Sequence, residues 1–167
     1  EAGSFAQDWS NAALITANDN WSGVPSVIGY RGDGASAASG VDPQTILGEG
    51  TVTVDVNANQ TNPVTFNTGG VTEFALTDPV VAVAGSSTAR GPSLLIHLNT
   101  SNRYNIVIGY NLRDLDGSTD NSIQPIALQY RIGSSGNFTN VPGGFVADAS
   151  SGPSLATLVT PVSVTLP

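Results

Sequence analysis

The sequence contains no cysteine and no methionine, and its one histidine is His97. The missing cysteine excludes disulfides, thiolate metal sites and cysteine nucleophiles. His97 lies in an alternating segment without an accompanying Gly-x-Ser-x-Gly motif, so we interpret it as a half-exposed strand residue. Glu49, Glu73 and the aspartates remain as candidates for paired-carboxylate hydrolysis, but their spacing singles out no pair. We therefore expect a protein that is not an enzyme.

Charge is also scarce. Charged residues make up 11% of the chain, the five basic residues are all arginine, and thirteen acids leave a net charge of −8. Nucleic acids and anionic membranes both require a basic surface, so we expect neither as a partner. No apolar run approaches the roughly 20 residues of a membrane-spanning helix, and no membrane insertion is expected.

A surface built from serine, threonine, asparagine, glutamine and glycine is common in extracellular bacterial proteins. The chain begins Glu1-Ala2-Gly3-Ser4, as expected for a mature protein after signal cleavage or for a trimmed chain. Both observations predict a secreted protein, located outside the cell or on its surface.

The remaining pattern is one of short strands. The one helical window is 8–16, with Asp8 or Ser10 as the N-cap, and it is long enough for a single turn. About ten apolar, alternating segments at intervals of roughly 8–12 residues predict an antiparallel β-sandwich, jelly-roll-like, in a single domain over 1–167. The expected strands cover 24–30, 51–56, 64–66, 71–76, 80–84, 93–99, 104–112, 126–132, 137–141, 156–160 and 162–166.

Two hairpins are predicted within this pattern. Asn67-Thr68-Gly69-Gly70 is a good turn between 64–66 and 71–76. Residues 104–112 and 126–132 flank an acidic loop, and we expect these two strands to pair with each other.

The acidic loop contains Asp114, Asp116, Asp120 and Asn121. These side chains could supply several of the 6–8 oxygen ligands that calcium takes. The spacing is not that of an EF-hand. The favoured alternative is a polar hairpin loop in which aspartate and asparagine cap backbone amides. No other cofactor is predicted.

Two further motifs are candidate binding sites. Trp21 lies in a turn-rich segment and is the best exposed candidate for stacking on a sugar ring, although aromatic residues in alternating strands usually pack in a core. Arg31-Gly32-Asp33 is the tripeptide that integrins recognise, but arginine and aspartate around a glycine also form an ordinary turn. We favour the ordinary turn.

The order and texture of the chain resemble a domain near the N-termini of large secreted bacterial proteins, some of which carry endonuclease/exonuclease/phosphatase-type nuclease domains downstream. The stretches that carry the resemblance are 20–33, 111–118, 128–131 and 138–142. The resemblance implies a secreted bacterial β-sandwich and no catalytic residues. In that family the domain continues beyond the segment that ends here at Pro167. We therefore expect either a trimmed fragment or a sandwich completed by a strand from a neighbour.

The favoured functional hypothesis is a non-catalytic, self-assembling surface protein, such as a filament subunit joined by strand donation. A carbohydrate-binding or adhesion module of a secreted multidomain protein, such as a secreted nuclease, is the alternative. Self-association is thus the main expected partnership, with a glycan as the second. The residues expected at the assembly contacts are Gly3, Ser4, Phe5, Ala6, Gln7, Val162, Val164 and Leu166.

The calcium hypothesis predicts a thermal shift. Calcium that binds only the folded state should raise the melting temperature, and EDTA should lower it again. The measurement is differential scanning fluorimetry with Asp116→Asn as the matched control, which should lose the shift. Identical melting curves with calcium and with EDTA would remove calcium from the description of this loop.

Overall fold

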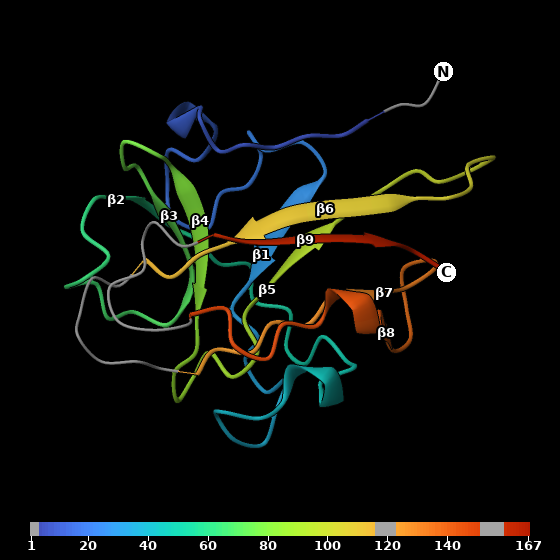
Figure 1. Ribbon diagram of the computed structural model, residues 1–167. Helices are drawn as coiled ribbons and strands as arrows, with labels where there is room; N and C mark the ends of the chain where they lie inside the picture. Colours follow the sequence, from blue (N-terminus) through green and yellow to red (C-terminus); the bar gives the residue numbers. More distant parts are fainter. Residues whose placement is uncertain (1–3, 116–122, 151–158) are drawn as a thin grey trace.

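The computed structural model describes residues 4–115, 123–150 and 159–167 (Figure 1). Three single 3-10 turns lie in these ranges: η1 (Ala12–Leu14), η2 (Pro43–Thr45) and η3 (Pro142–Gly144). The nine strands of the described residues are β1 (Val27–Tyr30), β2 (Asn57–Gln60), β3 (Gly70–Phe74), β4 (Val80–Ala84), β5 (Ser93–Ile96), β6 (Val107–Leu112), β7 (Gln129–Tyr130), β8 (Thr139–Asn140) and β9 (Thr160–Thr165).

The strands form four small hydrogen-bonded groups: β1 with β5, β2 with β3 and β4, β6 with β9, and β7 with β8. Every pairing is antiparallel except that of β2 with β3. The expected all-β class is confirmed, and the arrangement is compatible with a β-sandwich. No helix of the described residues is long and apolar enough to cross a membrane.

The hairpin expected across the acidic loop is wrong. In Figure 1, β6 lies beside β9, which follows it by about fifty residues, and β7 pairs with β8 instead. The register places Tyr110 opposite Val162 and Ile108 opposite Val164. Alternation identifies a strand and its apolar face but says nothing about which other alternating strand will pair with it.

The second expected hairpin is also wrong. Residues 64–66 form no strand, and β3 makes its hairpin with β4. Asn57–Gln60 lies outside all the expected strands, yet it forms β2. Side-chain amides hold this polar strand in place: Asn57 Nδ2 donates to the Val71 carbonyl at 3.1 Å, and Asn18 Oδ1 accepts from the Ala58 amide at 2.9 Å. Such bonds leave no hydrophobic pattern for sequence analysis to detect.

Two other expected elements are shorter than predicted or are interrupted. The helical window contains only η1, and its N-cap is Asn11 rather than Asp8 or Ser10. The segment 51–56 meets its neighbours through isolated bridges, Thr51 with Asp33 and Val54 with Tyr30, instead of a continuous ladder.

The main core lies where β1 and β3 meet the N-terminal third of the chain. Its buried members are Ile15, Trp21, Val24, Val27, Val56, Ala58 and Val71. The expectation that Trp21 is an exposed sugar-stacking residue is therefore wrong: it is 6% exposed. Its indole Nε1 donates to the Asp55 carbonyl at 3.0 Å, and its ring meets Trp9 edge to face at a centroid distance of 6.4 Å. A hydrogen-bonded and fully packed indole cannot offer a face to a ligand.

Gly29 lies in close contact with this core. A Cβ at Gly29 would lie 2.5 Å from the Trp21 ring and 2.8 Å from the Asp55 carbonyl oxygen. Real atoms cannot approach so closely, so β1 and the indole can pack this way only because residue 29 has no side chain.

We expect Gly29→Ala to lower the free energy of unfolding by about 1–3 kcal/mol through overpacking. Gly109→Ala is the control, because Gly109 also lies in a strand but its nearest atom to a new Cβ is the Val162 carbonyl oxygen at 3.8 Å. Urea unfolding of both variants provides the measurement. Equal losses of stability would show that the contact with Trp21 is not what requires glycine.

Candidate functional site

A broad hollow, open to solvent, lies between three edge strands. Its walls include all residues of β4, β5 and β6, together with the segment 123–134. The volume is about 3850 Å³, several times the roughly 300–1,000 Å³ of a small-molecule pocket. Its size therefore suits an inserted polypeptide segment better than a metabolite.

The lining is unusually rich in uncovered apolar side chains. Of the eleven large hydrophobic residues that the described chain exposes, nine line this hollow. They are Phe5, Val83, Ile96, Leu98, Tyr104, Val107, Ile123, Ile132 and Val159. Scattered exposed apolar residues need no explanation, but their concentration in one hollow marks an interaction site.

The lining is also balanced in charge. Within the residues that the structure describes, four of the five arginines and four of the ten acids border the hollow. The arginines are Arg90, Arg103, Arg113 and Arg131, and the acids are Asp8, Glu49, Asp78 and Asp114. Among the described lining residues, the arginines and acids are therefore equal in number, whereas the chain as a whole carries −8.

Each wall strand has a free edge within the part of the chain that the structure describes. There, β4 pairs only with β3, β5 only with β1, and β6 only with β9. An edge strand presents a row of backbone N–H and C=O groups that can pair with another chain.

The far wall is fixed by Arg131 and Gln129. Arg131 Nη2 donates to Glu49 Oε1 at 2.9 Å, and the guanidinium stacks on the Phe138 ring at 4.4 Å. Gln129 Nε2 donates to the carbonyls of Pro43 and Ile46 at 3.2 and 3.1 Å. These bonds join the segment around β7 to the loop that contains η2.

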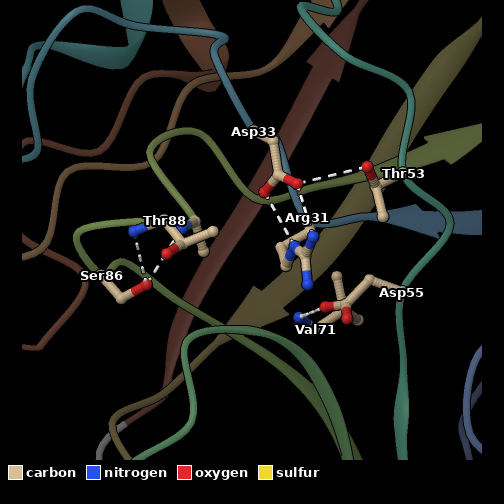
Figure 2. A network of polar contacts seen from close by, with 8 residues as sticks. Arg31, Asp33, Thr53, Asp55, Val71, Ser86 and Thr88 are labelled. Atoms are coloured by element: carbon tan, nitrogen blue, oxygen red, sulfur yellow. Dashed lines mark hydrogen bonds and ion pairs between the residues drawn. The ribbon is translucent and has the colours of Figure 1, made fainter.

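A polar network lies where β1 leaves the core, and its members Arg31, Asp33 and Thr53 are not among the residues that line the hollow (Figure 2). Arg31 makes a two-pronged ion pair with Asp33, with Nε to Oδ1 at 2.8 Å and Nη2 to Oδ2 at 2.6 Å. Thr53 Oγ1 donates to the same carboxylate at 3.2 Å. The hydrogen bond from Arg31 holds the pKa of Asp33 below its ordinary value. Since Arg31 and Asp33 bind each other, the Arg-Gly-Asp tripeptide forms a closed internal turn.

Asp55 is the buried member of this network. Its Oδ2 accepts from the Val71 amide at 2.6 Å, at the start of β3 (Figure 2). Burial raises the pKa of its carboxyl above the ordinary value, and the bond from Val71 acts in the opposite direction. Gly70 comes immediately before Val71 with φ +119°, and a side chain there would collide with the Asp55 carboxylate. Asp55 thus determines how β3 enters the sheet.

The predicted calcium loop lies largely outside the described residues. Asp116, Asp120 and Asn121 are not described, while Asp114 is described and half-buried at the rim of the hollow. The described part of the chain contains no cluster of three or more acidic, histidine or cysteine side chains suited to a metal. Calcium binding by this loop stays a prediction.

The predicted assembly residues fall into two groups. Ser4, Phe5 and Ala6 are exposed and Gln7 is half-buried, all at the rim of the hollow, while Gly3 lies outside the described residues. Val162 and Val164 belong to β9 and pair with β6, and the Leu166 amide donates to the Ile106 carbonyl at 2.8 Å. One edge of β9 therefore pairs within its own chain. Residues 4–7 belong to no strand.

Comparisons of the chain with protein-family models, with curated proteins and with solved structures each found no match.

Sequence analysis missed most of the hollow. Val83, Ile96 and Val107 lie within expected strands, but alternation does not show whether an apolar side chain is covered. The arginines that line the hollow come from segments far apart in the sequence, so their concentration there could not be predicted from the sequence alone.

The bond from Val71 to Asp55 predicts a specific mutational pattern. Asp55→Ala leaves a buried amide without an acceptor and should lower the free energy of unfolding by about 1–3 kcal/mol. Asp55→Asn keeps an acceptor of the same shape and should cost much less. Equal losses in urea unfolding at pH 7 would show that the hydrogen bond is not what matters.

The pH dependence provides a second check on the same residue. A carboxyl whose pKa is raised in the folded state binds protons more readily there than in the unfolded chain, so its contribution to stability increases as the pH falls. The wild-type protein should gain stability relative to Asp55→Asn between pH 7 and pH 3. The opposite trend would mean that Asp55 is stabilised as the anion.

Proposed function

We propose that this chain is a non-catalytic structural subunit of an extracellular bacterial assembly, in which copies join into a filament by β-strand donation. The hollow carries the proposal. It combines three free strand edges with most of the large apolar side chains that the described chain exposes. A donated strand would satisfy both features at once, because its backbone pairs with an edge and its side chains cover the apolar wall.

The charge distribution supports contact at this place. Two copies that each carry −8 repel one another over most of their surfaces. Among the described residues, the arginines and acids that line the hollow are equal in number, so copies can approach there at a lower electrostatic cost.

The alternative hypothesis, a carbohydrate-binding or adhesion module, has less support. It was assigned to Trp21, which is buried and hydrogen-bonded in the main core. The hollow also exceeds the size of a site for one or two sugar rings.

The test is assembly of the purified protein, followed by negative-stain electron microscopy and light scattering. We expect polymers for the wild-type chain and for Val64→Asp, since Val64 is 54% exposed but does not line the hollow. Val83→Asp places a charge in the hollow and should abolish the polymers while circular dichroism shows a folded protein. Uniform monomers at high concentration, or equal assembly of the two variants, would contradict the proposal.

A further inference from the structure

We infer that the donated strand is the N-terminal segment 4–8 and that it pairs in a second copy with the free edge of β4. This inference rests on the proposed function and assigns both partners of the contact.

The donor segment pairs with no strand in the described part of its own chain. Within the described residues, no backbone hydrogen bond joins 4–8 to any other part. Figure 1 shows this stretch running away from the sheets toward the N-terminus. Phe5, in its middle, is 44% exposed. An extended segment with a full row of unpaired amides and one large apolar side chain is suited to strand addition.

The acceptor edge is best provided by β4. It belongs to a three-stranded sheet whose central strand, β3, is buried along its whole length. β5 and β6 each belong to a two-stranded pair, which is a less stable template. All five residues of β4 line the hollow, and the donor segment is also five residues long. Pairing would extend the sheet from three strands to four.

The chemistry of the two partners matches. Residues 4–7 carry no charged side chain, so their insertion requires no burial of a charge. Asp8 follows at the end of the segment and, being exposed, can keep its contact with water. Phe5 would lie against the uncovered apolar wall that contains Val83. An acidic segment from elsewhere in this chain would lose its hydration on entering the hollow.

Pairing between copies follows from the same geometry. Residues 4–8 lie at the rim of the hollow in their own chain, yet none of their backbone groups bonds to β4 there. Donor and acceptor are different surfaces of one chain, so a donated strand leaves the donor's own β4 free for the next copy. Such head-to-tail contacts form open filaments unless the rotation between copies closes a ring.

Engineered cysteines provide a direct test, because the native chain has no cysteine to interfere. An Ala6→Cys chain is mixed with an Ala82→Cys chain that carries a tag and so differs from it in mass. The mixture is then assembled under mild oxidation. We expect a disulfide-linked heterodimer in gels. Leu95→Cys on β5 and Ile108→Cys on β6 are matched controls and should give at least a tenfold lower yield with Ala6→Cys.

Truncation separates this inference from the proposed function. Removal of residues 1–7, or Phe5→Ala, should raise the concentration needed for polymers at least tenfold, while Phe5→Leu should keep assembly. Polymers that persist without residues 1–7, or that link Ala6→Cys to β5 or β6, would overturn the assignment of donor and acceptor but leave self-assembly intact. A wild-type chain that forms no polymers would overturn both.

Discussion

The structure depends on the burial of Asp55 beside Trp21. The Asp55 backbone amide donates to the Gly29 carbonyl at 3.0 Å, its carbonyl accepts from the Trp21 indole, and its carboxylate accepts from the Val71 amide. One residue thereby joins β1, the turn-rich segment around Trp21 and the start of β3. These bonds are worth more in a buried setting because each group left unpaired there would carry its full cost of desolvation. The main core can therefore be compact although its side chains are mostly small.

That compact core covers only one side of the sheets. The cluster around Trp21 buries the junction of β1 and β3, while β4, β5 and β6 present apolar side chains to an open hollow. Two ion pairs hold segments beside these two regions. Arg31 and Asp33 hold the chain where it leaves β1, and Arg131 and Glu49 hold the segment around β7 against the loop that contains η2. A fold built in this way has a stable half and a half that gains most from an added strand.

Sequence analysis could predict the class of the fold and most of the strands, because β1, β4, β6 and β9 are rich in β-branched residues. It could not predict the partners of these strands. β6 and the segment around β7 follow one another and alternate equally well, yet β6 pairs with β9, so proximity in sequence was a poor guide. β2 was missed because its four residues are held by amide hydrogen bonds. Of the residues that line the candidate site, sequence analysis singled out only Ser4 to Gln7, Asp114 and Leu166 as site residues.

The charge of the chain and the shape of the hollow favour the same kind of contact. A surface with a net charge of −8 and no lysine stays soluble and discourages random association. The same repulsion would oppose assembly if the contact lay anywhere on the acidic surface. Balanced arginines and acids around the hollow remove that obstacle at one place, and free strand edges there impose a direction and a register on whatever enters. Repulsion between the acidic surfaces of two copies disfavours contacts elsewhere. An uncharged, extended segment is therefore the kind of segment that can reach the apolar wall.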